Sequence, residues 1–241
     1  MSVTINGICD FFPAAVALAD PSPTPGTLMT LQFNQGTGNS AVLADKNYIV
    51  LEVPQLTGNG QVETSLLAAG LPNFCKKLGD QINMTPSSNP GNGPRAAGDG
   101  MNTRFNVYAG GYGNQLQPGT FPPDTNIQEF ISHYDYINRT LGQVTAPNPN
   151  GLIAADDRRL LVVPIILPNG PPPLQPSYPA YTTNIKAWGV FFLKSKVPTP
   201  NGNCSDTPGC GSIPVEYVGK SQLGNSDPLC GTGLVTPVLY R

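Results

Sequence analysis

The 241-residue chain carries 13 basic and 15 acidic residues, for a formal net charge of −2 and a pI of about 5.3. This balance offers no basic surface for holding phosphates, which argues against nucleic-acid binding. Only 12% of the residues are charged, while glycine and proline number 27 each. We therefore expect short elements joined by many turns rather than long helices.

The first half of the chain predicts short strands and one helix. Alternation of apolar and polar residues indicates a half-buried strand, and a short β-branched run ended by proline indicates a buried one. In chain order we expect a strand-like start at 3–5, an apolar segment at 11–18, strands at 27–33 and 48–53, a short helix near 63–69 and a loop at 83–100.

The second half predicts most of the sheet. We expect strands at 104–109, 160–167, 185–193, 213–218 and 234–239, an ambiguous segment at 127–137 and an exposed extended segment at 168–182. Pro164 interrupts one apolar run and predicts a bulge or an edge there. The pattern fits one mainly β domain over 1–241, a β-sandwich-like or mixed sheet with long Pro/Gly-rich loops and one or two short helices. Exposed strand edges would let it add strands to a neighbour.

Five cysteines suggest an oxidising compartment. Cys204 and Cys210 flank a short Pro-Gly turn, so we expect a local disulfide between them. Cys9, Cys75 and Cys230 are an odd remainder, of which one is either free or paired between molecules. The chain has no run of about 18 apolar residues that would span a membrane, and it shows no signal peptide.

Catalytic patterns are missing from the sequence. His133 is the only histidine, no GxSxG nucleophile elbow is present, and one histidine cannot build a multi-histidine metal site. Residues 91–95 resemble a phosphate loop but lack the following Lys-Ser/Thr, and we interpret them as a flexible turn. We expect no enzyme, no cofactor and no metal. A calcium site remains an open alternative, because four side chains offer oxygen atoms: Asp99, Asp124, Asn126 and Asp135.

Clustered charges and polar residues predict structural roles. Asp156 and Asp157 precede Arg158 and Arg159, which predicts an ion-pair cluster at the start of a strand. We expect Arg104, Arg158 or Arg159 to donate forked hydrogen bonds to carbonyls or carboxylates that pin long loops, Glu216 being one such partner. Contact with an assembly partner is the alternative role for Arg104. Asn102 and Thr103 are expected to bond the backbone of the preceding turn.

Three segments resemble, in order, the soluble domain of TadG-like proteins from the Tad (tight-adherence, Flp-type) pilus machinery. These are Gly-Asp-Gly-Met-Asn-Thr-Arg-Phe-Asn-Val-Tyr at 98–108, Asp-Asp-Arg-Arg-Leu-Leu-Val-Val-Pro-Ile-Ile at 156–166, and the aromatic strand 185–193 followed by Ile-Pro-Val-Glu-Tyr-Val-Gly at 213–219. The resemblance implies a non-catalytic pilus component tethered by an N-terminal transmembrane helix. This sequence shows no such helix, so we expect any tether to come from a removed segment or a partner.

The leading hypothesis is a structural domain of a bacterial pilus or envelope assembly, in the periplasm, on the cell surface or outside the cell. Its partners would be proteins, including further copies of itself. The alternative is a carbohydrate-binding or adhesin-type module that uses loop tyrosines at 108, 112, 178 and 181. The candidate structural and interaction residues are Asn102, Arg104, Phe105, Asp157, Arg158, Arg159, Trp188, Cys204, Cys210 and Glu216.

Overall fold

The fold comes from a computed structural model. It describes residues 11–19, 23–33, 43–51, 60–70, 76–84, 93–108, 115–138, 157–168, 181–199, 204 and 209–221. The strands predicted at 3–5 and 234–239, together with Cys9, Cys75 and Cys230, lie outside these residues. Among the described residues, no helix is both long and apolar enough to cross a membrane.

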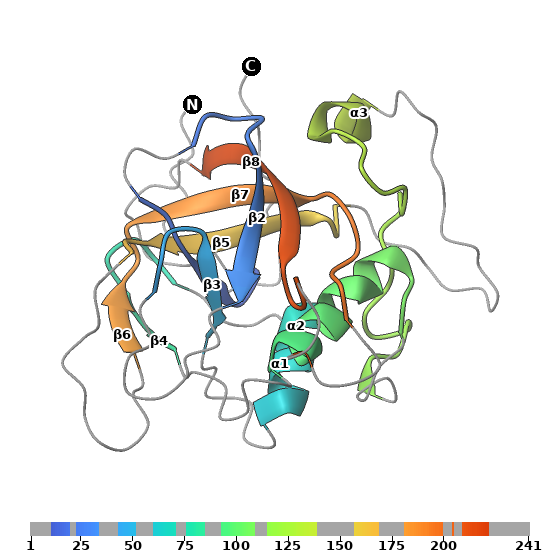
Figure 1. The fold of residues 1–241 in the computed structure, drawn as a ribbon, viewed down its shortest axis with the longest axis horizontal. Coiled ribbons are helices and arrows are strands. Elements are labelled where there is room, and N and C mark those ends of the chain that lie inside the picture. Colours follow the sequence, from blue (N-terminus) through green and yellow to red (C-terminus); the bar gives the residue numbers. More distant parts are fainter. Residues whose placement is uncertain are drawn as a thin grey trace.

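Six strands form a closed barrel (Figure 1). Their order around it is β1 (Ala14–Ala17), β3 (Asn47–Val50), β2 (Leu28–Phe33), β8 (Ile213–Ser221), β7 (Ala187–Leu193) and β5 (Leu160–Ile166). The β1–β5 and β2–β3 pairs are parallel and the other four are antiparallel. The fold is therefore mainly β, and its sheet mixes parallel and antiparallel pairs, as predicted. The sandwich and exposed-edge predictions are wrong for this sheet, because closure pairs every strand on both sides.

The barrel interior is filled by the inward side chains of all six strands. Strand β2 shows the predicted alternation, with Met29, Leu31 and Phe33 buried and the residues between them exposed. Tyr48 is fully buried in the same interior, where its hydroxyl donates to the Gly211 carbonyl at 2.7 Å. The alternating and β-branched segments thus form the strands that their sequence patterns predict.

Strands β5 and β7 are buried on both faces and pair in continuous register from Leu160–Phe192 to Ile165–Ala187. The bulge or edge predicted at Pro164 is wrong, because Pro164 pairs with Trp188 inside that register. The irregularity lies instead between Val190 and Phe191, in the β7–β8 pairing.

A second apolar cluster covers the outside of β1, β3, β5 and β7. A two-stranded antiparallel sheet, β4 (Gln81–Met84) with β6 (Tyr181–Asn184), lies on this flank (Figure 1). Ile82 and the adjoining Ile185 enter the cluster, where Trp188 is 1% exposed. Neither strand was predicted, because each has only four residues and lies beside a segment interpreted as loop or extended chain.

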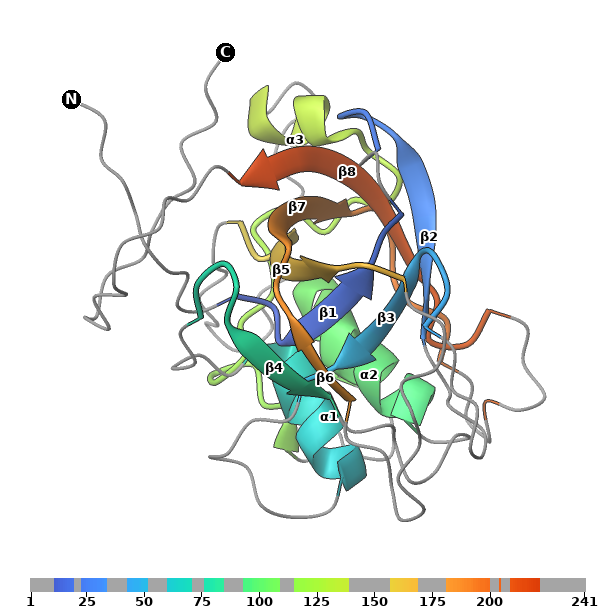
Figure 2. The same ribbon diagram turned by 90° about the vertical axis from the view of Figure 1, so that its left-hand side faces the viewer.

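Two helices pack across one end of the barrel (Figure 2). Helix α1 (Gly60–Ala69) agrees with the prediction, and α2 (Gly93–Asn102) packs tightly against it. A Cβ atom on Gly100 would lie 2.3 Å from the Ser65 carbonyl oxygen, so only glycine permits this approach. Leu67 and Met101 extend from the helix pair into the barrel interior.

Sequence predictions are wrong in the region of helix α2 and the 3-10 helix that follows it. The loop predicted at 83–100 is wrong at 83–84, which end β4, and from Gly93 onward, where α2 also replaces the flexible turn predicted at 91–95. Pro94 occupies the first helical turn, which tolerates proline. The strand predicted at 104–109 is also wrong: a 3-10 helix, η2 (Thr103–Phe105), ends at Asn106 with φ of +60°. The apparent alternation there arises because Phe105 faces the barrel interior. The ambiguous segment 127–137 overlaps α3 (His133–Asn138).

Candidate interaction site: a buried arginine network

The described parts of segments 98–108, 156–166, 185–193 and 213–219 meet at one place. The end of α2 and η2, the start of β5, the end of β7 and the middle of β8 surround the junction between the helix pair and the barrel. Three arginines, Arg104, Arg158 and Arg159, occupy this junction, which we call the arginine network.

Arg104 and Arg158 both bond the C-terminal end of α1. Arg104 is 4% exposed; its Nη1 donates to the Ala68 carbonyl at 2.6 Å and its Nε to the Arg158 carbonyl at 2.8 Å. Arg158 Nη2 donates to the Ala69 carbonyl at 2.9 Å. The last carbonyls of a helix lack partners within the helix and carry its negative dipole end. The two guanidinium groups therefore cap α1 and join it to η2 and β5.

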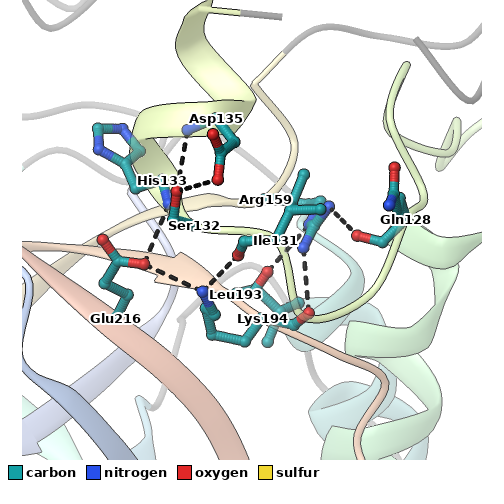
Figure 3. A network of polar contacts seen from close by, with 9 residues as sticks. All are labelled: Gln128, Ile131, Ser132, His133, Asp135, Arg159, Leu193, Lys194 and Glu216. Carbon is teal, nitrogen blue, oxygen red and sulfur yellow. Dashed lines mark hydrogen bonds and ion pairs between the residues drawn. The ribbon is translucent and has the colours of Figure 1, made fainter. Parts of the chain in front are cut away.

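Arg159 is fully buried and bonds four backbone carbonyls, of which those of Gln128, Leu193 and Lys194 are drawn in Figure 3. Its Nε donates to Leu193 at 2.9 Å, Nη1 to Asn126 at 3.0 Å and Gln128 at 2.9 Å, and Nη2 to Lys194 at 3.2 Å. The guanidinium also lies 4.5 Å from the Phe192 ring centroid and 4.8 Å from that of Phe105. Burial lowers the pKa of Arg159 to about 10, so the group remains charged at neutral pH.

Asp124 is the carboxylate of this network, and it is fully buried. It accepts hydrogen bonds from the Asn126 backbone nitrogen at 2.7 Å, the Arg159 backbone nitrogen at 3.0 Å and the Tyr136 hydroxyl at 2.9 Å. Burial raises the pKa of Asp124, and these three donors oppose the rise. An Asx turn at Asp124–Asn126 was the sequence signal for this role, but Asp124 was considered only as a calcium ligand.

Asn102 connects α2 to the segment after β7. Its side-chain amide accepts from the Val197 nitrogen at 2.7 Å and donates to the Val197 carbonyl at 2.9 Å, as a neighbouring strand would. Only Thr103 bonds the preceding turn as predicted, through the Gly100 carbonyl at 2.7 Å. Asn102 instead reaches a residue 95 positions away, which sequence spacing could not indicate.

Asp99 is buried beside the same segment, with 2% of its surface exposed. Its Oδ2 has no hydrogen-bond partner, and Arg95 Nε lies 3.9 Å away. Burial raises the pKa of Asp99 to about 6, against the opposing effects of Arg95 and a hydrogen bond with Thr199. This carboxylate is thus held at an energetic cost at neutral pH.

Glu216 pairs with a lysine rather than with an arginine. Its Oε2 accepts from Lys194 Nζ at 3.1 Å and from the His133 backbone nitrogen at 3.0 Å (Figure 3). Lys194 Nζ also donates to the Ile131 carbonyl. The prediction that Glu216 anchors an arginine is therefore wrong, and Lys194 was missed by the sequence reasoning.

The remaining candidates lie at different distances from the network. Phe105 packs against Arg159, and the Asp157 nitrogen donates to the Tyr136 hydroxyl at 3.1 Å in a left-handed turn with φ of +60°. For the predicted ion-pair cluster, Asp156 lies outside the described residues, and the arginines bond backbone carbonyls. Trp188 lies outside the network, in the apolar cluster under β4 and β6, with its ring 4.9 Å from that of Phe11.

The predicted disulfide between Cys204 and Cys210 is present, with Cα atoms 5.5 Å apart and both cysteines buried. Gly211, the next residue, packs against Pro94: a Cβ atom there would lie 2.5 Å from that of Pro94. The Gly211 carbonyl also accepts the Tyr48 hydroxyl. The bridge therefore adjoins a contact that joins β8 to α2 and β3.

Ser132, His133 and Asp135 do not form a catalytic triad. The Ser132 hydroxyl donates to Asp135 at 2.6 Å, and the Asp135 nitrogen donates back to Ser132 at 3.0 Å, which caps the start of α3. The His133 imidazole points away from both side chains (Figure 3). Within the described ranges, no three His, Cys, Asp or Glu side chains are placed to hold a metal ion.

Comparison of the chain with protein-family models, with curated proteins and with solved structures gave no significant match. The arginine network itself therefore carries the functional argument. Its polar groups are directed to backbone carbonyls of the same chain, and it joins segments far apart in the sequence.

Proposed function

We propose that the chain is a structural interaction domain of an exported bacterial pilus or cell-envelope assembly of the TadG-like kind. The observation that carries the proposal is the convergence of the three TadG-like segments on one network. Arg104 of the first segment bonds the Arg158 carbonyl of the second, and Arg159 of the second bonds the Leu193 carbonyl of the third.

The donors of the arginine network support a structural role rather than ligand binding. Arg104 and Arg159 are 4% and 0% exposed and direct their hydrogen bonds to backbone carbonyls. Such buried guanidinium groups are committed to holding the chain together and have little capacity left for a substrate. The Cys204–Cys210 bridge supports an oxidising location, in the periplasm or outside the cell.

The contact surface for a protein partner lies next to the network, around α3. Phe130 is 75% exposed and Tyr134 67% exposed. Phe130 also has a φ of +65°, which costs a bulky residue about 1 kcal/mol. Its backbone nitrogen is fixed to the Lys194 carbonyl at 2.7 Å. A rigidly held, exposed aromatic is the kind of group that anchors protein interfaces.

Of the four tyrosines named for the carbohydrate-binding alternative, Tyr108 is the one whose side chain lies within the described residues. Its hydroxyl donates to the Phe121 carbonyl at 2.7 Å, its ring packs on a small apolar cluster, and burial raises its pKa to about 12. Tyr112, Tyr178 and the side chain of Tyr181 lie outside the described residues. Because its ring and hydroxyl are used in packing, Tyr108 does not support sugar binding.

The test is gene deletion in the native host followed by complementation, with pili counted by electron microscopy. We expect deletion to abolish or sharply reduce piliation and the wild-type gene to restore it. Phe130→Ser with Tyr134→Ser should fail to restore pili while the purified domain keeps its melting temperature. Leu167→Ser, at a residue 42% exposed just after β5, is the matched control and should restore them.

Normal piliation in the deletion strain would refute the assembly role. Full restoration by the double serine variant would instead refute the α3 contact surface. Peptide mapping without reductant of protein isolated from the same host should recover Cys204 linked to Cys210. Recovery of both as free thiols would refute export to an oxidising compartment.

A further inference from the structure

His133 is a buried histidine with an unpaired nitrogen. It is the only histidine of the chain and the first residue of α3. Its side chain packs on Phe192 with ring centroids 5.6 Å apart, the residue is 8% exposed, and Nε2 is enclosed without a hydrogen-bond partner. A neutral imidazole can leave this nitrogen as an unused acceptor. An imidazolium would bury a charged donor with nothing to accept it.

Charged groups surround His133 from three other elements. Glu216 on β8 and Asp157 in the turn before β5 favour the protonated imidazole, whereas Lys194 after β7 opposes it. Glu216 is already engaged by Lys194 at 3.1 Å and by the backbone nitrogen of His133 at 3.0 Å. On α3 itself, Asp135 is paired with Ser132. Burial exceeds these effects and lowers the pKa of His133 below its ordinary value of 6.5.

Helix α3 is held by a small set of contacts. Its apolar side belongs to a cluster of Ile131, Tyr136 and Phe192, with Leu160 and Val218 at the margin. Its polar attachments run through the Tyr136 hydroxyl, which donates to Asp124 and accepts from the Asp157 nitrogen, and through the His133 nitrogen, which donates to Glu216 on β8. With only six residues, α3 has little stability of its own. A modest energetic change at His133 can therefore decide whether it stays docked.

We propose that α3 is a pH-sensitive latch: protonation of His133 in mildly acidic surroundings releases α3 from β7 and β8 and uncovers Phe192. The direction follows from linkage. Above pH 6.5 the imidazole is neutral in both states, and docking keeps its full strength. As the pH falls below 6.5, the released imidazole takes up a proton before the docked one does. The ratio of docked to released α3 then falls by up to tenfold per pH unit, until the docked imidazole also titrates.

The test combines proton NMR of the imidazole with hydrogen exchange on the full chain between pH 4.5 and 7.5. Because there is one histidine, its ring signals report this site alone. We expect a titration midpoint below 6.5. Protection factors of amides in residues 131–138, corrected for intrinsic exchange rates, should fall by up to tenfold per pH unit below pH 6.5.

Two neutral replacements separate His133 from other acid-sensitive groups. His133→Phe and His133→Asn should each keep the protection of 131–138 constant over this pH range, and either variant suffices if the other fails to fold. Asp99→Asn removes a carboxyl that titrates near pH 6 on α2, and it should leave the α3 response unchanged. A midpoint at or above 6.5, or the same pH response in a foldable His133 variant, would overturn the latch.

Discussion

The barrel is covered in physically different ways at two places. We call the side under β4 and β6 the apolar flank and the end under the helix pair the polar flank. Under β4 and β6 the contact is apolar, with Trp188, Ile82 and Ile185 packed on the outer faces of β1, β3, β5 and β7. At the helix junction, Arg104, Arg158 and Arg159 bond backbone carbonyls instead. An apolar cover gains free energy in proportion to buried area and tolerates repacking. A buried polar junction specifies each partner, and it loses much when one donor is removed.

The largest expected loss tests the polar flank. Arg159→Met should lower the free energy of unfolding by about 4 to 5 kcal/mol, because four carbonyls each lose a hydrogen bond and Asp124 loses its cation. Urea denaturation is the measurement. Arg159→Lys should recover only part of the loss, since an ammonium group cannot reproduce the planar fork. A loss below about 1 kcal/mol in the Met variant would show that the network is not a stabilising feature.

A comparable deletion tests the apolar flank. Trp188→Ala should cost about 3 to 4 kcal/mol by removing a fully buried ring and leaving a cavity. Trp188→Phe should cost less, because most of the volume is kept. The loss for each variant, measured by urea titration, should be the same at pH 5 and pH 7, because the residues that form this cluster are apolar. A strong pH dependence would contradict the contrast between the flanks.

Removing a single side-chain amide from the polar flank should lower the free energy of unfolding by a smaller amount. Asn102→Ala should cost about 2 kcal/mol, because the Val197 nitrogen and carbonyl both lose their partner. Thermal unfolding, with Asn106→Ala as the control for a turn residue of the same type, measures the difference. Since φ at Asn106 is +60°, the control should cost about 1 kcal/mol. Equal losses in both variants would remove the special role of Asn102.

The smallest effect concerns the energetic cost that the polar flank carries. Asp99 has a pKa of about 6 when folded against an ordinary 3.8, so folding binds its proton more tightly. The protonated Asp99 therefore contributes favourably to the free energy of unfolding. That contribution is complete below pH 3.8 and is lost as the pH rises through 6. Asp99→Asn should therefore raise the free energy of unfolding by about 1 kcal/mol at pH 7 and by progressively less toward pH 4. Urea titrations that show a loss at pH 7 would contradict this assignment.

Sequence patterns predicted what depends on local periodicity. The alternation of β2, the apolar runs of β5 and β7 and the helix ending at Ala69 are visible because each buried face repeats within one element. Helix α2 was missed because most of its buried residues are glycine and alanine, a composition that resembles a loop. These residues are small because α1 approaches α2 closely at Gly100.

The arginine network could be predicted only in part. Forked donation by arginines to carbonyls follows from guanidinium chemistry, and it is observed for Arg159. The partners could not be predicted, because Arg104 reaches Ala68 and Arg158 reaches Ala69 through contacts between elements. Backbone carbonyls carry no residue identity, so a sequence cannot show which of them an arginine will bond. Glu216 was expected to pair with an arginine, but its partner Lys194 is brought to it by the pairing of neighbouring strands, which the sequence does not show.

The order of strands around the barrel also sets when it can form during synthesis. Strand β1 needs β5 as one neighbour, and β2 needs β8, whose pairing residues begin about 180 positions later. The ring cannot close before Ser221, the last residue of β8, has been made and released. Until then β1 and β2 each lack one of their two neighbouring strands, so the barrel stays open while the segments between them are made. One side of β1 and of β2 thus stays unpaired until nearly the whole barrel sequence has emerged.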